Sequence, residues 1–446
     1  MGGGDVLSDL IAALATPPGR SALAVVRLSG LGAFDVGRRV LCWPDDRLIR
    51  ARQVELATAY SPSGHPVDQL MVTFFQAPAS YTGEDLVEFS CHGGLLVPAQ
   101  LLGVLCEAGA RLAGPGEFTR RAVLNGKIDL LQAEAVGDLI DATTVAQGRG
   151  ALRQLDGGLS RRLEVLRYNL TDLLALLSYD LDFPEEDDGP VERATVLGGL
   201  DAVVDAIRRL LETALIGERV RRGALVVLAG RPNAGKSSLF NAMLGSERAL
   251  VNEAPGTTRD TIEADLDLTG WPIRLADTAG LRPSADRIEQ MGIEVSRRYL
   301  AAADLVLLCV EAGRALNAEE AALAADPRTL LVRTKADLAS SPGLAISAKS
   351  RVGLESLKTA LVSRLFEGSQ PLGDFEPMLT RERHRVSLEA ALAALGDAKP
   401  HLAPTGDAVL VAHHVRRAVA SLDELIGAID VEEVLGLIFS RFCVGK

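Results

Sequence analysis

Residues 230–237 read Gly-Arg-Pro-Asn-Ala-Gly-Lys-Ser and directly follow the apolar run Ala224–Ala229. They fit the pattern G-x-x-x-x-G-K-[ST], set between a strand and a helix. The glycines allow backbone N–H groups to turn inward around phosphate oxygens, Lys236 meets the β- and γ-phosphate charge, and the Ser237 hydroxyl can ligate Mg²⁺. The stretch therefore predicts a phosphate-binding loop of the P-loop type.

Around this loop, strand-like runs alternate with helix-compatible stretches, which is typical of a mostly parallel α/β sheet. The runs are residues 273–276, 305–310 and 329–332. In residues 261–268, apolar and acidic side chains alternate, and Thr269-Gly270 can turn the chain into the next strand. We expect this segment to form an antiparallel hairpin at the edge of the sheet.

Other parts of the chain follow different patterns. The first ~120 residues mix β-like runs, such as 22–28 and 69–75, with turns, which predicts a separate α+β domain. Leucines then fall three or four apart on one helical stripe over residues 163–181, a second helical stretch covers about 191–220, and helical sequence resumes after about residue 370.

The expected fold class is therefore multidomain α/β, with a P-loop domain inserted into a helical one. The expected boundaries are an N-terminal α+β domain at 1–121, a discontinuous helical domain at 122–217 and 371–446, and the inserted domain at 218–370.

Composition excludes several classes of protein. The 446 residues are 48% hydrophobic and carry 47 Lys and Arg against 59 Asp and Glu, a net charge of −12, which argues against disorder and against wholesale coating of nucleic acid. Neither a membrane span nor a signal peptide is evident, so we expect a cytoplasmic protein with no membrane partner. Five scattered cysteines without a Cys-x-x-Cys pair indicate neither a disulfide framework nor a zinc site.

Two segments have the character of nucleotide switches. Asp277-Thr278-Ala279-Gly280 begins 41 residues after Lys236, where a carboxylate can approach Mg²⁺ and a Gly amide can sense a γ-phosphate. Between them, residues 256–260 supply a hydroxyl, from Thr258, for a second Mg²⁺ contact. Two loops on the γ-phosphate side make a switch that depends on hydrolysis possible.

A later pair of segments indicates the base. In Thr334-Lys335-Ala336-Asp337, the Asp carboxylate can accept from both N1–H and the exocyclic amine of guanine, which adenine cannot reproduce. Ser347-Ala348-Lys349 follows the next β-like run, where its backbone can support the base. In this order and spacing, the motifs specify guanine.

The residue types alone leave the catalytic group open. Many switch GTPases place a Gln after Asp-Thr-Ala-Gly to orient water, but Leu281 is apolar. The available carboxylates are Asp286, Glu289 and Glu294. Because no isolated arginine finger is recognisable, a bound cation could neutralise the developing charge.

Five stretches carry a wider resemblance. They are ATPPGRSALAVVRLSG at 15–30, YTGEDLVEFSCHGG at 81–94, PGEFTRRAVLNGKIDLLQAEAVGDLIDA at 115–142, GRPNAGKSSLFNAMLG at 230–245 and IFSRFCVGK at 438–446. Together they resemble the MnmE (TrmE) family of tRNA-modification GTPases along essentially the whole chain.

This resemblance implies an N-terminal folate-type domain that dimerises and binds a 5-formyl- or 5,10-methylene-tetrahydrofolate, a discontinuous helical domain and an inserted GTPase domain. It further implies a heterotetramer with the flavoprotein MnmG. That complex attaches an aminomethyl or carboxymethylaminomethyl group at the 5-position of the tRNA wobble uridine. GTP hydrolysis with K⁺-dependent association of the GTPase domains drives the cycle.

The resemblance also implies residue roles. Glu289, twelve residues after Asp277, matches the water-orienting Glu, and Cys443 matches the family's C-terminal Cys, with a part in the modification chemistry. The implied K⁺ contacts are Asn233, Asn252, Ala254 and Thr257, and the implied Mg²⁺ ligands are Ser237 and Thr258. The implied folate contacts are Arg27, Glu88, Lys127 and Lys446. The implied GTP contacts are Asn233, Ala234, Gly235, Lys236, Ser237, Ser238, Asn252, Glu253, Ala254, Pro255, Gly256, Thr257, Thr258, Asp277, Thr278, Ala279, Gly280, Thr334, Lys335, Ala336, Asp337, Ser347, Ala348 and Lys349.

One departure concerns Thr334, which replaces the usual Asn of the guanine motif, although its hydroxyl can still tie that loop to the phosphate loop. A folate shared by Arg27 and Lys446 requires the C-terminal tail to reach the N-terminal domain. Two alternative functions stay open here: a ribosome-assembly GTPase with the same GTPase domain, and a folate-dependent aminomethyl transferase. Detection of bound folate would discriminate against the first.

Overall fold

The computed structural model describes residues 9–182, 193–245, 263–277, 297–366, 377–403, 406–427 and 445. The chain divides into two compact units, Met1–Gly137 with Ile426–Lys446, and Asp138–Leu425. Each unit is described by itself below. The finer domain boundaries expected from the sequence stay a prediction.

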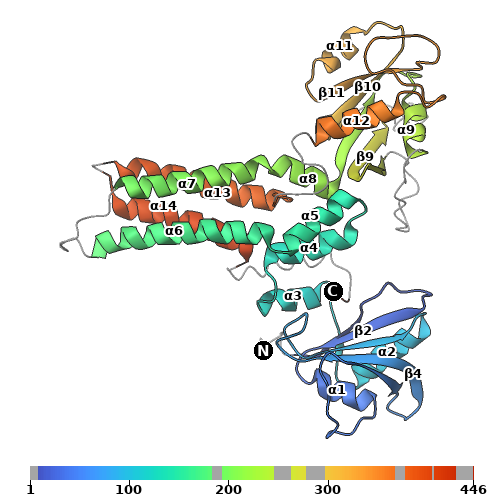
Figure 1. The fold of residues 1–446 in the computed structure, drawn as a ribbon, viewed down its shortest axis with the longest axis vertical. Coiled ribbons are helices and arrows are strands. Elements are labelled where there is room, and N and C mark those ends of the chain that lie inside the picture. The colour runs from blue at the N-terminus through green and yellow to red at the C-terminus, as the bar shows by residue number, and fades with distance from the viewer. Residues whose placement is uncertain are drawn as a thin grey trace, which may run out of the picture. The chain divides into compact units, whose positions relative to one another are not determined.

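The first unit contains a six-stranded sheet in the order β3-β4-β5-β2-β1-β6, antiparallel except for the short pair β1–β6 (Figure 1). Its elements are β1 (Ile11–Leu14), β2 (Leu23–Ser29), α1 (Ala33–Val40), β3 (Val54–Tyr60), β4 (Pro66–Phe75), β5 (Leu86–His92), α2 (Leu96–Glu107), β6 (Arg111–Leu112), α3 (Glu117–Leu124) and, at its boundary, α4 (Leu130–Asp141). The α+β character expected for this region is confirmed.

The two faces of this sheet differ. On one face, alternating strand residues such as Val26, Leu28 and Phe89 are buried against α1 and α2. On the other, a small cluster forms around Phe118 of α3. Alternation of side chains along a strand separates the two sets, so this second face is free to carry polar groups.

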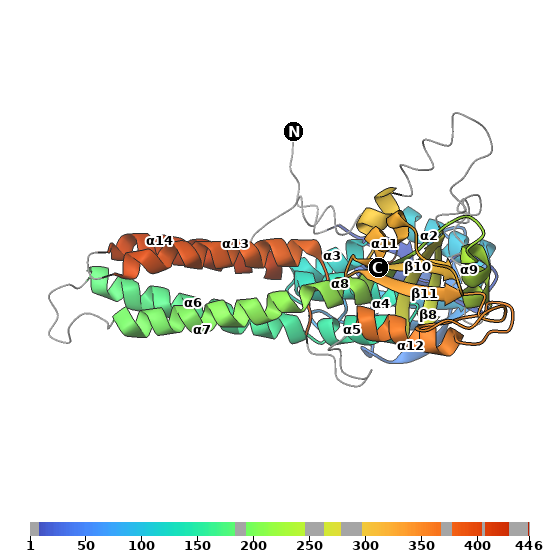
Figure 2. The same ribbon diagram turned by 90° about the horizontal axis from the view of Figure 1, so that it is seen from above.

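In the second unit, four helices form a bundle: α6 (Gly158–Asp182), α7 (Arg193–Glu212), α13 (Glu382–Ala398) and α14 (Ala408–Ile426). Figures 1 and 2 both show them side by side. The predicted leucine stripe of α6 is buried at Leu163, Leu166 and Leu170. A short 3₁₀ helix, Lys399–Leu402, links the last two helices in sequence.

The helical stretch expected at about 191–220 is in fact divided into α7 and α8 (Ala214–Arg222). Thr213 lies between them, and both its N–H and its hydroxyl donate to the carbonyl oxygen of Leu210, at 3.0 and 2.6 Å. The same hydroxyl oxygen accepts from Leu379 N–H at 3.1 Å. The helix is interrupted where this side chain holds the segment that follows the inserted domain in sequence, a long-range contact that local periodicity does not encode.

The inserted domain contains a five-stranded sheet in the order β11-β10-β7-β9-β8. All neighbouring pairs are parallel except β8–β9, which forms the predicted antiparallel edge hairpin. Its elements are β7 (Ala224–Ala229), α9 (Lys236–Leu244), β8 (Glu263–Leu268), β9 (Trp271–Asp277), β10 (Leu305–Glu311), α11 (Ala318–Ala324), β11 (Thr329–Thr334) and α12 (Leu354–Leu365). The expected fold class is confirmed, with β7 at its predicted bounds.

One helix from outside this domain completes its core. Helix α5 (Val145–Leu155) begins at a capping box formed by Thr144 and Gln147. Its residue Ala146 is fully buried among side chains of the inserted sheet, and its N–H donates to the carbonyl oxygen of Gly270 at 2.9 Å. The Gln147 amide donates to the carbonyl oxygen of Arg221 at 3.1 Å. Helix α5 therefore contacts both the β8–β9 turn and the end of α8, which leads into the inserted domain.

Across the described parts of the chain, no helix is both long enough and apolar enough to cross a bilayer.

Candidate functional site

The loop between β7 and α9 has the backbone that a phosphate cradle needs. Gly230 and Gly235 have φ angles of +131° and +86°, and Asn233 lies in the left-handed region at +60°. A Cβ atom on Gly230 would lie 2.3 Å from the carbonyl oxygen of Cys309, so only glycine fits there. The loop ends at Lys236, the first residue of α9, so the positive end of a helix faces the cradle.

Lys236 and Ser237 lie as the motif requires. Residue Lys236 is 6% exposed, and its ammonium donates to the carbonyl oxygens of Gly230 and Arg231, at 2.7 and 2.9 Å, so it lies inside the loop. The Ser237 hydroxyl donates to Oδ2 of Asp277 at 2.8 Å. Since Asp277 ends β9, neighbouring strands β7 and β9 bring a hydroxyl and a carboxylate together. These are the oxygen ligands that Mg²⁺ prefers.

The loop after β11 is tied to the phosphate loop. The buried Thr334 hydroxyl donates to the carbonyl oxygen of Ala234 at 2.6 Å, which confirms the role expected for a Thr in place of Asn. Lys335 follows in the left-handed region, with φ +55°. Ala336 N–H then donates to the carbonyl oxygen of Ile346 at 3.0 Å, which joins this loop to the segment that carries Ser347.

Asp337 is exposed and held as an acceptor. The Ser347 hydroxyl donates to its Oδ1 at 2.7 Å. This hydrogen bond, aided by the charges of Lys349 and Lys335, lowers the pKa of Asp337 below its usual value. The carboxylate is therefore ionised at neutral pH and can accept hydrogen bonds from a base.

Between the two loops lies a cleft of about 280 Å³. Its lining comprises Arg231, Pro232, Asn233, Ala234, Val310, Glu311, Arg314, Glu320 and Lys335. Arg231 pairs with Glu320 at 2.8 Å, and Lys335 with Glu311 at 3.4 Å. Sequence reasoning missed both carboxylates, although an acidic residue directly after the apolar run 305–310 was a visible signal.

Several expected site residues lie outside the described part of the chain. These are Asn252, Glu253, Ala254, Pro255, Gly256, Thr257, Thr258, Thr278, Ala279, Gly280, Glu289, Cys443 and Lys446.

In the first unit, Arg27 and Glu88 are cross-strand neighbours on β2 and β5, and Arg27 Nε donates to Glu88 Oε1 at 2.8 Å. The guanidinium lies 5.8 Å from the centre of the Tyr81 ring. Lys127 donates to the carbonyl oxygen of Pro78 at 2.9 Å. The structure thus pairs two of the expected folate contacts and ties the third to the loop that carries Tyr81.

The C-terminal tail reaches the same sheet. Gly445 has φ +100°, and a Cβ atom there would lie 2.3 Å from the carbonyl oxygen of Leu14. Leu14 ends β1, where its neighbour Ala13 pairs in register with Arg27. Gly445 therefore meets the N-terminal sheet of its own chain one residue from the position facing Arg27.

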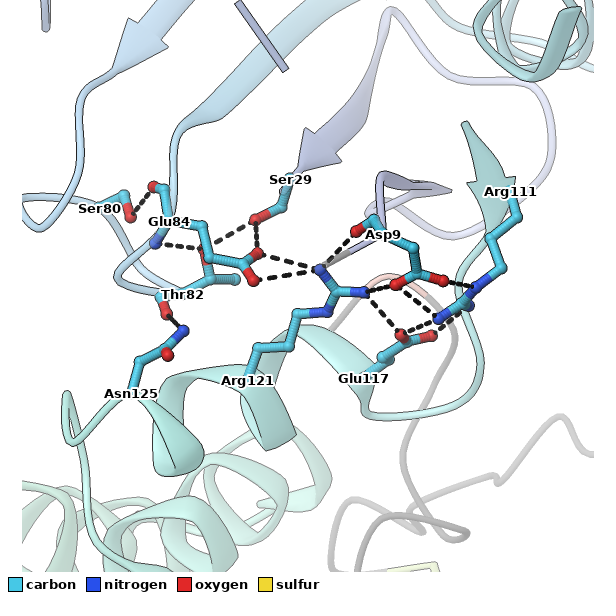
Figure 3. A network of polar contacts seen from close by, with 9 residues as sticks. All are labelled: Asp9, Ser29, Ser80, Thr82, Glu84, Arg111, Glu117, Arg121 and Asn125. Carbon is cyan, nitrogen blue, oxygen red and sulfur yellow. Dashed lines mark hydrogen bonds and ion pairs between the residues drawn. The ribbon is translucent and has the colours of Figure 1, made fainter. Parts of the chain in front are cut away.

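Beside these residues lies a charged network that the sequence did not reveal (Figure 3). At its centre Arg121 of α3 is 1% exposed and donates to Asp9 Oδ1, Glu84 Oε1 and Glu117 Oε1 at 2.6, 3.1 and 3.1 Å. Arg111 bonds the same Asp9 and Glu117. Two cations thus face three carboxylates, drawn from segments up to 112 residues apart.

This network holds the 80–84 loop against the sheet. Glu84 accepts from the Ser29 hydroxyl at 2.8 Å, and the Asn125 amide donates to the carbonyl oxygen of Thr82 at 2.7 Å. Burial acts to raise the pKa of Glu117, but hydrogen bonds from Arg111, Gly114 N–H and Arg121 outweigh it, so the pKa is lowered. The Glu117 carboxylate is therefore kept ionised beside Arg111 and Arg121.

A phosphate loop with a buried lysine, a Ser–Asp pair at the ends of adjacent parallel strands, and a Thr-Lys-Ala-Asp loop bonded to it define a P-loop GTPase. Comparisons with known proteins agree. A family model described as the MnmE helical domain matches residues 130–443, and one described as the GTP-binding protein TrmE N-terminus matches residues 10–127.

Three relatives named tRNA modification GTPase MnmE each align over 99% of this chain and 100% of their own length. Those of Chloroflexus aurantiacus, Paramagnetospirillum magneticum and Aquifex aeolicus are 40%, 43% and 38% identical to it. The chain belongs to the MnmE family of tRNA modification GTPases, which confirms the resemblance drawn from its motifs.

Proposed function

We propose that this chain hydrolyses GTP with the help of Mg²⁺ and K⁺ and acts in the cytoplasm on the wobble uridine of tRNA. Its partner is the flavoprotein MnmG, and a tetrahydrofolate derivative supplies the one-carbon unit. The observation that carries the GTPase half is the contact between Ser237 and Asp277 beside a buried Lys236.

In this proposal, Lys236 moves from two loop carbonyls to the β- and γ-phosphates, which replaces two neutral acceptors by charged ones. Ser237 and Asp277 fit Mg²⁺, because both offer oxygen at one point of the loop. When bound, Mg²⁺ neutralises phosphate charge. Asp337 accepts from the guanine edge while Ser347 holds it in place.

The catalytic step needs a group to orient water and a charge to stabilise the transition state. Glu289 takes the first role by its match to the family motif, with Thr258 as the second Mg²⁺ ligand. Asn233, exposed in the phosphate loop, offers a hard oxygen to K⁺ together with Asn252, Ala254 and Thr257.

For folate, the paired Arg27 and Glu88 present a cation and a carboxylate on the face of the N-terminal sheet opposite α1 and α2. A cation suits the glutamyl carboxylates, and a carboxylate can hold the amino-pyrimidine edge of a pterin. The position of Gly445 supports a further contact from Lys446 of the same chain. Cys443 lies two residues before Gly445 in sequence, which favours a role in the chemistry near this site.

A second copy of the chain fits the edge of the same sheet. Leu56 on β3 and Met71 on β4 are cross-strand partners and are 63% and 42% exposed, with Val54 of the same edge at 59%. Adjacent exposed apolar side chains mark an interaction surface more than isolated ones do. They favour the proposed homodimer through the N-terminal unit.

Two experiments test this function. Changing Asp337→Asn should cost a few kcal/mol of GTP binding and improve binding of the xanthosine nucleotide, because xanthine presents the reverse hydrogen-bonding polarity. An unaltered preference for GTP over the xanthosine nucleotide would show that Asp337 does not read the base.

The second experiment removes Cys443–Lys446. The truncated protein should lose wobble-uridine modification, measured by mass spectrometry of tRNA, and keep its GTPase rate. Retained modification would refute the folate site, and a proportional loss of GTPase activity would mean that the tail is structural. A ribosome-assembly GTPase, the alternative considered, would bind no folate in calorimetry.

A further inference from the structure

The stretch from the last residue of β10 to α11 pairs with a cation of each nucleotide loop. Glu320, the third residue of α11, pairs with Arg231 of the phosphate loop. Glu311, the last residue of β10, pairs with Lys335 of the base loop. Each carboxylate lines the cleft between the loops. Of the two pairs, Glu311–Lys335 is the one that involves the loop proposed to bind the base.

Two contacts hold Glu311 besides its pair with Lys335. Its backbone is paired in register with Thr334 on β11, and Thr334 is bonded to the phosphate loop. Its Oε1 lies 3.4 Å from the Lys335 ammonium. Its Oε2 lies 3.4 Å from Arg314 Nε, three residues on. The carboxylate therefore has little freedom to follow Lys335, whereas Lys335 can follow the carboxylate.

Lys335 has a long stem that samples many rotamers when free. It directly precedes the Ala336-Asp337 pair that is proposed to face guanine, and its backbone is already held in the left-handed region. An apolar stem held in one direction offers a fixed surface to a planar base, and ordering it in advance removes that entropy cost from the binding step.

We propose that Glu311 is a positioning residue for guanine nucleotide binding: it holds the Lys335 side chain along the base side of the cleft before the nucleotide arrives. This inference rests on the proposed guanine site. Because Glu311 pairs with Lys335 of the base loop and not with Lys236, Ser237 or Asp277, it should act equally on GDP and GTP and leave the chemical step alone.

The test uses the full-length Glu311→Gln variant, which keeps the size of the side chain and removes its charge. Affinities for fluorescent GDP and a GTP analogue should fall by the same factor, roughly two- to fivefold for a partly exposed ion pair, mainly through a faster off-rate. The KM for GTP should rise while kcat at saturating GTP stays the same. Glu311→Asp, which keeps the charge, should recover part of the affinity.

Two comparisons isolate the pair. In a Lys335→Met background, Glu311→Gln should have no further effect, because the group it positions is gone. Glu355→Gln, which removes the exposed carboxylate of another Lys–Glu pair, on α12, should leave nucleotide binding unchanged.

Unchanged or tighter binding by Glu311→Gln, or an equal loss in the Lys335→Met background, would overturn the proposal. The Asp337→Asn experiment separates the two levels. If Asp337→Asn alters base preference while Glu311→Gln changes nothing, only the positioning role falls. If Asp337→Asn changes nothing, the base site itself is misplaced.

Discussion

The two sheets of this molecule assemble their candidate sites in opposite ways. In the parallel sheet of the inserted domain, Ser237 and Asp277 meet because β7 and β9 are neighbours that end at the same edge. In the antiparallel sheet of the first unit, Arg27 and Glu88 meet across strands, and Arg121 joins a residue 112 positions away. In the parallel sheet, the candidate functional residues lie in loops at the ends of the strands, where short sequence motifs describe them. In the antiparallel sheet, they are spread over one face and come from distant parts of the sequence.

The largest effect is expected at the GTPase site of the inserted domain. Glu289→Ala should retain nucleotide binding and lose about 10²- to 10⁴-fold in kcat, because the group proposed to orient water is removed. Turnover should also require K⁺ over Na⁺, since K⁺ is proposed to take the place of the arginine finger. Steady-state phosphate release with each salt measures both. Equal rates in the two salts, with an unimpaired variant, contradict the mechanism.

The network in the first unit should respond in stability and not in GTP turnover. Arg121→Met leaves Asp9, Glu84 and Glu117 facing one another and should destabilise the N-terminal unit by about 3–5 kcal/mol. Urea unfolding followed by circular dichroism measures this, with a GTPase assay on the same sample. Arg38→Met, which removes a surface pair, should cost at most ~1 kcal/mol. Equal costs for the two variants would mean that burial of Arg121 is not decisive.

A smaller effect, on folate affinity, is expected at the Arg27–Glu88 pair of the same unit. Arg27→Ala removes the charge-assisted contact proposed with folate, worth ~1.5–3 kcal/mol, and should weaken 5-formyltetrahydrofolate binding roughly 10- to 100-fold. Calorimetric titration measures it. Arg47→Ala, which breaks the pair with Glu55 at 2.6 Å, is the matched control and should bind folate normally. Equal weakening in both variants would remove Arg27 from the site.

The smallest effect is a dependence on pH. The pKa of Asp9 is lowered: burial acts to raise it, but Arg111 and Arg121 outweigh that, as they do for Glu117. Carboxylates with lowered folded-state pKa values stabilise the protein above their unfolded pKa and lose that contribution as pH falls below about 4. We expect about 1 kcal/mol or less, because solvent screens the partly exposed Asp9. Unfolding midpoints from pH 3 to 7 should show it in the native protein and show less of it in Arg121→Met, where Arg111 still bonds both carboxylates.

The same contrast decides what the sequence could predict. β7 matches its predicted bounds and the edge hairpin appears as expected, because apolar runs and turn residues are local signals. The Thr334 contact followed from the order of the motifs. The break at Thr213 and the pairing of Lys335 with Glu311 did not, since each depends on a partner far away in sequence. The Arg121 network falls in the same group, because its residues look like ordinary surface charges one by one.

The contact between α5 and the inserted sheet matters for exchanging GTPase domains between relatives. Ala146 belongs in sequence to the helical region, yet it fills the core of the inserted sheet and bonds Gly270. A chimera that transplants only the stretch from β7 to α12 would set a foreign β8–β9 turn on this helix. Residues 144–155 should be transplanted together with the sheet, so that the helix and the β8–β9 turn still match. The unit that can be exchanged is therefore larger than the inserted domain itself.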